Sequence, residues 1–208
     1  MNFKINRDHF GAGLQLVSSV VGSRKTMPIL QNVLIEAKDG GISLSTTNLD
    51  LGIKCSVFAD VEEEGSVTLP VKEILRIVRQ LADMEVKVSS TGTPKATIST
   101  RGSIFNIVGL ESKEFPPLPE LESSKSFSLE REELTTMLKS VSYAQSVNEE
   151  RYMLKGVFFQ KEEETISLVA TDGRRLAVTR KEEKTTSENN GEFILPSLTV
   201  AELERLPG

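Results

Sequence analysis

Apolar and polar positions in the first part of the chain follow two periods, and each period predicts a different element. Between Asp8 and about Val21 apolar side chains recur every three or four positions, as in a helix that buries one face. Alternation near 29–37, 42–47 and 51–59 is typical of half-buried strands. A short strand at 3–5 precedes the helix. The pattern therefore predicts the order strand, helix, strand, strand, strand.

The same order begins again after an acidic stretch, Glu62-Glu63-Glu64-Gly65, which we predict to be a loop. A strand is expected at 67–70, an amphipathic helix at 71–81, and three more strands between 85 and 110. The first part of the chain is thus predicted to hold two strand–helix–strand–strand–strand modules in tandem.

One face of the predicted helix at 71–81 is basic. Lys72, Arg76 and Arg79 are spaced four and three positions apart, so they share the side opposite the apolar residues. Glu73 lies on another side of the same helix. Such a stripe is usually a solvated helix face, and the spacing alone does not decide between that and a binding surface.

The chain also contains a long internal repeat. Equivalent residues lie 124 positions apart, and after a loop the offset becomes 126; the pairs include Leu14 and Leu138, Leu30 and Leu154, Thr47 and Thr171, and Leu69-Pro70 and Leu195-Pro196. A repeat of this length indicates two copies of one domain. We predict domains at 1–122 and 123–208, joined by the extended linker Phe115-Pro116-Pro117-Leu118-Pro119. The second copy lacks the part that follows the helix in the first, so we expect a truncated piece of a longer protein.

Composition and charge restrict the classes of function. The chain has 208 residues, a net charge of −5 and one cysteine, Cys55. A single cysteine excludes an internal disulfide and favours a cytoplasmic setting. No apolar run is long enough to cross a bilayer, and the N-terminus is not a signal peptide. A protein that grips nucleic acid by charge alone is usually basic, so any DNA contact here should be local.

The residue types give no support for catalysis. The chain has no Gly-rich phosphate loop and no cluster of metal ligands, and its only histidine, His9, is expected on a helix surface. Asp172 and Arg174 have no nucleophile or base beside them in the pattern. We therefore predict a protein that is not an enzyme and binds neither metal nor cofactor.

The stretch from Val169 to Ala177 is the best candidate for a binding element. It is predicted to form a hairpin whose turn is Asp172-Gly173, because glycine tolerates positive φ and aspartate bonds the local backbone. Arg174 and Arg175 replace Asp50 and Leu51 of the first copy. Positions shared by both copies, such as Thr171, serve the fold, so the two arginines are the stronger functional candidates. An ordinary hairpin with solvated charges remains the plainer interpretation of this stretch alone.

Several motifs together resemble the bacterial sliding clamp family, the beta subunit of DNA polymerase III. They occur in family order along the whole chain, at Met27–Leu34, Val67–Pro70, Phe115–Pro119, Arg151–Val157 and Val169–Ala177. The resemblance implies an α+β DNA clamp fold with helices on the inner face and sheets outside. It implies three domains per chain, of which the third is absent here, and a homodimeric ring around double-stranded DNA. Such a protein is a processivity factor that tethers the replicative polymerase, the clamp loader and repair proteins.

The resemblance also assigns residues to three kinds of contact. Contacts to DNA, independent of sequence, are implied for Arg24, Lys72, Arg76, Arg79, Lys139, Arg151 and Tyr152. A pocket for the peptides of client proteins is implied for Leu154, Thr171, Gly173, Arg174, Arg175 and Leu176. The surface that closes the ring is implied to include Phe105 and Ile107 on an edge strand, with a core position as the alternative for Phe105.

A second hypothesis has the same repeat but a different function. It is a scaffold that binds a peptide or protein and does not encircle DNA. Release from DNA after linearisation of a loaded circle separates the two, because only a ring slides off the ends.

Overall fold

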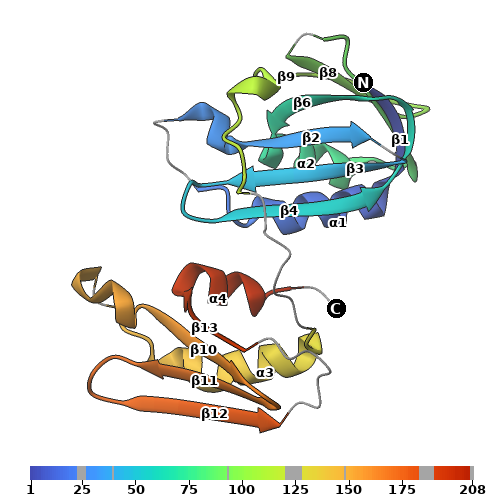
Figure 1. Cartoon of the computed structure of the whole chain (residues 1–208). Coiled ribbons are helices and arrows are strands. Elements are labelled where there is room, and N and C mark those ends of the chain that lie inside the picture. Colours follow the sequence, from blue (N-terminus) through green and yellow to red (C-terminus); the bar gives the residue numbers. More distant parts are fainter. Residues whose placement is uncertain are drawn as a thin grey trace. The chain divides into compact units, whose positions relative to one another are not determined.

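The computed structural model describes residues 1–22, 27–38, 40–92, 94–119, 128–147, 149–182 and 190–206. The chain divides into two compact units, Met1–Pro119 and Glu120–Gly208. The first unit has two antiparallel sheets and the second has one, and helices pack on the sheets in each unit (Figure 1). The predicted α+β class is confirmed by this arrangement.

The first unit contains both predicted modules. Its first module comprises β1 (Asn2–Asn6), α1 (Arg7–Ser18), η1 (Pro28–Gln31), β2 (Asn32–Lys38), β3 (Gly41–Thr47), β4 (Gly52–Phe58) and β5 (Asp60–Glu63). Its second module comprises β6 (Gly65–Pro70), α2 (Val71–Gln80), β7 (Glu85–Ser89), β8 (Lys95–Ser99), β9 (Ile104–Val108) and η2 (Ser112–Glu114).

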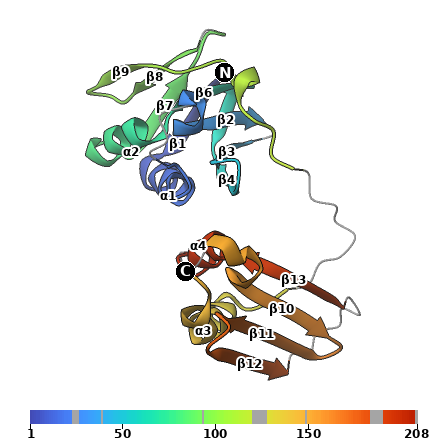
Figure 2. The same ribbon diagram turned by 90° about the vertical axis from the view of Figure 1, so that its left-hand side faces the viewer.

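The two modules exchange their first strands. One sheet has the order β5-β1-β7-β8-β9 and the other the order β4-β3-β2-β6, so β1 completes the sheet of the second module and β6 that of the first. Helices α1 and α2 lie side by side on one face of the unit (Figure 2). Their apolar sides and both sheets enclose one core, which includes Phe3, Phe10, Leu44, Leu69 and Ile74. The unit therefore cannot be divided between its two modules.

Helix α1 begins at Arg7, one residue earlier than Asp8 suggested. The side chain of Asn6 caps it, because Asn6 Oδ1 accepts hydrogen bonds from the backbone N–H groups of Asp8 at 2.9 Å and His9 at 3.3 Å. His9 is exposed, as predicted. The helix ends at Ser18.

Two sequence-based assignments in the first unit were wrong. Residues 29–31 form the 3-10 turn η1 and not the start of a strand, because Pro28 fixes φ at the position where that turn begins. Glu62 and Glu63 belong to the edge strand β5 and not to a loop. The Glu62 carboxylate lies 2.7 Å from Lys4 Nζ and 3.3 Å from Lys87 Nζ, so ion pairs to the neighbouring strands stabilise an acidic edge.

The proline-rich stretch at 115–119 is partly anchored to the first unit. Phe115 is buried in a small apolar cluster with Ile29 and Leu30. The side chain of Leu118 covers the α-carbon of Gly52, where any β-carbon would collide with it. The segment forms neither helix nor strand at 116–119, and both Phe115 and Leu118 pack against the first unit.

The second unit contains a single sheet with the order β12-β11-β10-β13. Its elements are α3 (Arg131–Val141), η3 (Ser142–Ala144), η4 (Glu149–Leu154), β10 (Gly156–Glu162), β11 (Thr165–Thr171), β12 (Leu176–Glu182), β13 (Gly191–Pro196) and α4 (Ser197–Leu203). Lys161 lies in β10 and is 2% exposed, and its Nζ donates to the carbonyl oxygen of Glu163 at 3.0 Å. Helix α3 covers β11 and β12.

The repeat in the sequence is reproduced in strand register. Val33 pairs with Leu69 between β2 and β6, and Val157 pairs with Leu195 between β10 and β13. A helix contact is repeated as well. Arg7 Nη1 donates to the carbonyl oxygen of Leu81 at 2.8 Å, and its equivalent Arg131 donates to that of Leu206 at 2.9 Å. These bonds satisfy carbonyls beyond the ends of α2 and α4.

Candidate functional site

Helix α2 separates an apolar face from a basic face. Its buried side is formed by Val71, Ile74, Leu75 and Val78. Lys72, Arg76 and Arg79 are all exposed on the other side, which confirms the predicted placement of the stripe. None of the three makes an ion pair with a carboxylate in the part of the chain that the structure describes. Arg79 Nη2 donates to Gln15 Oε1 of α1, which ties the stripe to the neighbouring helix.

The other residues predicted to contact DNA lie on different elements. Lys139 is exposed in the last turn of α3, and Arg151 is exposed in η4 with the non-helical backbone angles φ −106° and ψ 54°. Tyr152 follows in the same 3-10 segment. Arg24 lies outside the described residues. Lys139, Arg151 and Tyr152 belong to the second unit, and the α2 stripe belongs to the first.

The candidate binding turn between β11 and β12 is held by two side chains. Thr171 Oγ1 donates to the carbonyl oxygen of Arg175 at 2.7 Å and accepts from the Gly173 N–H at 3.1 Å. Asp172 Oδ1 accepts from the N–H groups of Arg174 at 2.9 Å and Arg175 at 3.0 Å. Gly173 has φ +85°, in the region that favours glycine.

The first copy of the repeat contains the same turn. Thr47 Oγ1 donates to the Leu51 carbonyl oxygen at 3.1 Å, and Asn48 Oδ1 accepts from the Asp50 and Leu51 N–H groups at 3.0 and 2.8 Å. Leu49 occupies the place of Gly173, with φ +77°. Thr171 therefore builds the turn in both copies. What distinguishes the second turn is the arginine pair that it carries.

Arg175 is held by two groups at once. Its Nε donates to Asp172 Oδ2 at 3.0 Å, and its guanidinium carbon lies 5.6 Å from the centre of the Tyr143 ring. Hydrogen bonds from the Arg174 and Arg175 N–H groups, then from the Arg175 side chain, hold the pKa of Asp172 below its ordinary value. The Asp172 carboxylate therefore stays charged and holds both the backbone and the side chain of Arg175 in place.

Apolar side chains stand beside the two arginines. Leu176 is 65% exposed and Val178 is 47% exposed on β12, and Leu154 is half-buried at the end of η4. The structure also brings Arg151 against the turn, because a β-carbon on Gly173 would lie 2.9 Å from Arg151 Nη1. Thus the structure joins a predicted DNA contact to a predicted pocket residue.

Sequence reasoning missed two residues of this surface. Val178 could have been found, because it lies two positions after Leu176 and so on the same face of β12. Tyr143 has no such signal, because only folding brings it to a residue 32 positions further along the chain.

The edge strand β9 carries three exposed apolar side chains. Ile104 is 71% exposed, Phe105 36% and Val108 65%. Ile107 is only 3% exposed and belongs to the core, so its predicted side-chain role in an interface is corrected. By strand alternation Phe105 lies on the same face of β9 as Ile107, whereas Ile104 and Val108 lie on the opposite face. Phe105 stays partly exposed on the face where Ile107 joins the core, and Ile104 and Val108 are further exposed candidates on the other face.

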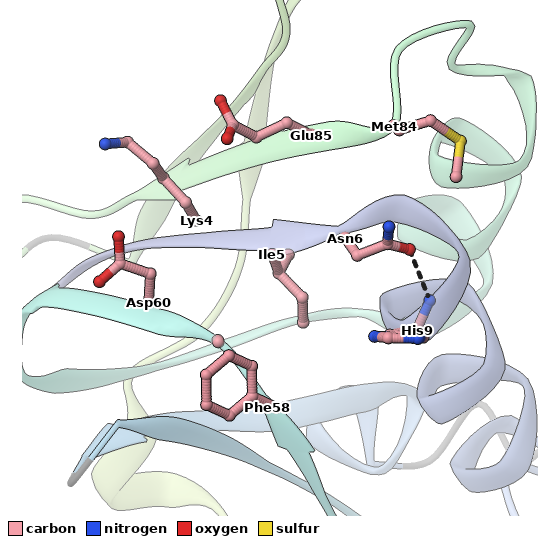
Figure 3. Close-up of a pocket in the computed structure, with 9 residues that line it drawn as sticks. Lys4, Ile5, Asn6, His9, Phe58, Asp60, Met84 and Glu85 are labelled. Carbon is pink, nitrogen blue, oxygen red and sulfur yellow. Dashed lines mark hydrogen bonds between the residues drawn. The ribbon is translucent and has the colours of Figure 1, made fainter.

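A cavity of about 340 Å³ lies where β1 leads into α1 (Figure 3). Its apolar wall includes Ile5, Phe58 and Met84. Lys4 lines it too, and the hydrogen bond and charge of Glu62 hold the pKa of Lys4 above its ordinary value. Asn6 Oδ1 is used in capping the helix. Among the residues that the structure describes, none of those predicted for DNA, peptide or ring contacts lines this cavity.

The described residues contain no group of three or more His, Cys, Asp or Glu side chains that could hold a metal ion. None of the helices in the described ranges has the length and apolar character needed to span a bilayer.

Comparison with known proteins places these features in a family. Residues 1–119 match the family model of the DNA polymerase III beta subunit, N-terminal domain, and residues 128–207 match that of the central domain. The beta sliding clamp of Chlamydia pneumoniae is 32% identical over 206 residues, covering 99% of this chain and 56% of that protein. The chain therefore spans somewhat more than half the length of the relatives it matches.

Solved structures agree with the sequence comparison. The DNA polymerase III subunit beta of Pseudomonas aeruginosa superposes with a TM-score of 0.92 at 30% identity, covering 99% of this chain and 56% of that one. The DNA polymerase sliding clamp of Bacillus subtilis superposes with a TM-score of 0.92 at 26% identity, again over 99% and 56%. With both domain models matched in order and the clamp fold reproduced, this chain belongs to the DNA polymerase III beta subunit family.

Proposed function

We propose that the chain provides the N-terminal and central domains of a processivity factor for the bacterial replicative polymerase. The protein encircles double-stranded DNA as a homodimeric ring in the cytoplasm and tethers the polymerase, the clamp loader and repair proteins. It performs no chemistry of its own. The observation that carries the proposal is the α2 face, where three exposed cations have no carboxylate partner among the described residues.

The α2 stripe suits phosphate better than it suits base edges. Lys72, Arg76 and Arg79 lie on the surface of a helix that is packed into the core along its other side. Cations in this position attract a phosphate backbone without reading sequence. The chain has a net charge of −5, so the attraction is confined to this face and a weak hold allows the protein to slide. Retention then depends on the closed ring.

The turn at 172–175 suits an extended peptide. Leu176 and Val178 offer apolar surface to Leu or Phe anchors, while Arg174 and Arg175 offer donors to polar groups of the peptide. Leu154 and Gly173 complete the part of the pocket that this chain contributes, on the turn that Thr171 builds. Ring closure is assigned to the edge strand β9, whose exposed apolar side chains are Ile104, Phe105 and Val108.

The decisive experiment for encirclement uses a protein as long as the relatives. The protein is loaded on nicked circular DNA, the DNA is cut once, and retained protein is measured. We expect release on cutting and retention on the uncut circle, because a ring slides off free ends. Protein that stays on the cut DNA, or never binds the circle, would favour the scaffold that does not encircle DNA.

The pocket assignment is tested separately. Arg175→Ala should weaken binding of a fluorescent peptide with a Leu-Phe pair, while Arg180→Ala, on the strand β12 that follows the turn, serves as the control. Arg175 is exposed, so the thermal midpoint should change little. Unchanged peptide affinity in Arg175→Ala would remove Arg175 from the pocket without affecting the ring proposal.

A further inference from the structure

The Tyr143–Arg175 contact adds a residue to the proposed peptide pocket. We propose that Tyr143 is a positioning residue, which holds the Arg175 guanidinium ready for a carboxylate or carbonyl oxygen of the bound peptide. The inference rests on the proposed peptide-binding function and names the chemistry of its ligand. The Tyr143 ring lies 5.6 Å from the guanidinium carbon, within the range of a cation–π contact.

The contacts of Arg175 leave one edge of its guanidinium available. Nε is bound to Asp172 Oδ2 at 3.0 Å, and the Tyr143 ring lies over the group. The two Nη atoms make no hydrogen bond within the described part of the chain. A planar fork with a free Nη edge matches the oxygen pair of a carboxylate, or a single carbonyl oxygen. The expected ligand is therefore a peptide with such an acceptor next to an apolar anchor.

The backbone that carries Tyr143 is fixed before any ligand arrives. Ala144, the next residue, is fully buried, and the Ser146 N–H donates to the Leu154 carbonyl oxygen at 3.0 Å. Tyr143 itself is 62% exposed. The exposed ring of Tyr143 is not required by the core. It is required if Arg175 is to rest on a rigid platform.

The first copy of the repeat provides an internal comparison. At the offset of 124, Tyr143 corresponds to Ser19 and Arg175 to Leu51. The turn is the same in both copies, as its hydrogen bonds show. The aromatic ring and the arginine are thus both absent from the copy that lacks the proposed pocket. This co-occurrence is expected if the two residues act together and has no basis in the shared fold.

The test measures peptide affinity in a protein extended to the length of its relatives. The probe is a fluorescent synthetic peptide with a glutamate next to a Leu-Phe pair, and a second probe has alanine in place of the glutamate. Tyr143→Leu should weaken the glutamate peptide about two- to fivefold, the range expected for an exposed cation–π contact. Tyr143→Phe, which keeps the ring, should bind nearly as well as the unaltered protein.

Three controls separate positioning from other effects. Phe58→Leu removes an exposed aromatic side chain of the first unit and should leave affinity unchanged. The alanine peptide should lose less affinity in Tyr143→Leu than the glutamate peptide, because it lacks the side-chain carboxylate and offers Arg175 only backbone carbonyl oxygens. Combined with Arg175→Ala, Tyr143→Leu should cause no additional loss.

A structural readout needs no peptide. In the NMR spectrum of the 208-residue chain, the Arg175 side-chain protons should be shifted upfield by the Tyr143 ring and should lose that shift in Tyr143→Leu. Unchanged peptide affinity in Tyr143→Leu, or a loss that adds fully to that of Arg175→Ala, overturns the inference. Failure of the proposed pocket itself looks different, because the unaltered protein would then bind neither peptide, and the inference would fall with it.

Discussion

At the scale of single residues, the two copies of one turn separate structure from function. Thr47 and Thr171 make the same backbone bonds 124 positions apart, so a threonine there is required by the hairpin. Leu49 adopts φ +77° where the second copy has Gly173 at φ +85°. A leucine in that region costs roughly 1 kcal/mol, which the first turn tolerates and the second avoids. The sequence comparison of the copies had already ranked Arg175 above Thr171 as a site residue.

Replacing Asp172 by asparagine should preserve the turn and release the arginine. Asn48 shows that an asparagine accepts both backbone bonds at this place, but a neutral amide gives up the ionic bond to Arg175 Nε. We expect Asp172→Asn to keep the thermal midpoint and to weaken peptide binding. Asp172→Ala, the control, loses the backbone bonds too and should lower the midpoint in a thermal melt. Equal midpoints for the two variants would contradict this assignment.

The pH dependence of the turn follows from the lowered pKa of Asp172. A carboxylate whose pKa is lower in the folded state stabilises that state above the unfolded pKa, and the contribution is lost as the pH falls through the folded pKa. We expect the carboxyl carbon of Asp172 to titrate below the ordinary value of 3.8 in an NMR titration. Because the hydrogen bonds from the backbone N–H groups are the largest cause, Arg175→Ala should raise the titration midpoint of Asp172 only part of the way to that value. A titration midpoint at or above 3.8 in the unaltered protein would refute the assignment.

At the scale of elements, α1 illustrates how closely a helix can approach a sheet. Helix α1 contains two glycines, Gly11 and Gly13, each of which lowers helix propensity by about 1 kcal/mol relative to alanine. A β-carbon on Gly13 would lie 2.8 Å from Val57 Cγ2 and 2.9 Å from Leu44 Cδ1, whereas one on Gly11 would meet only Val78 Cγ1 at 3.7 Å. Of these two glycines, only Gly13 lies where a β-carbon would be too close to the sheet.

The two glycines give a matched pair of variants. Gly13→Ala should destabilise the protein by about 1–3 kcal/mol, because the added methyl group overpacks the contact between α1 and the β3–β4 strands. Gly11→Ala meets ordinary van der Waals distance and should stabilise by up to about 1 kcal/mol through helix propensity. Chemical denaturation measures both. Destabilisation of similar size in the two variants would mean that helix packing does not distinguish them.

Strand existence was more predictable than strand pairing. Alternation identified β3, β4 and β6 within a residue or two, and the α2 pattern located its buried face. It missed β5, whose only apolar residue is Val61 and whose glutamates are stabilised by ion pairs across the sheet. It also could not assign β1 to the sheet of β7, since a strand's own pattern does not identify a partner about 80 residues away.

At the scale of the whole molecule, we expect DNA binding to depend on the charge of the α2 face more than on the net charge of the chain. Neutralising the stripe by the triple change Lys72→Gln, Arg76→Gln and Arg79→Gln should weaken DNA binding for every sequence alike. The slope of log affinity against log salt should fall by roughly 0.9 for each phosphate contact removed. Titration of the ring-forming protein with duplex DNA at several salt concentrations measures this.

A control for that prediction changes the same number of charges elsewhere in the first unit. Lys54, Lys95 and Arg101 are exposed on or beside the strands β4 and β8. Their replacement by glutamine alters net charge equally and should leave the salt slope unchanged. An equal fall in both variants would show that net charge, and not the α2 face, governs the interaction.

By itself the sequence determined the duplication, the strand and helix periods, the solvent-facing side of the α2 cations and the turn chemistry at 171–175. These are local properties, because spacing along one element decides which side chains share a face. Tertiary structure alone decided the exchange of β1 and β6, the burial of Ile107, the approach of Arg151 to Gly173 and the Tyr143 ring over Arg175. Each of these depends on contacts between distant segments, which form only when hydrogen-bonded sheets and a shared core bring those segments together.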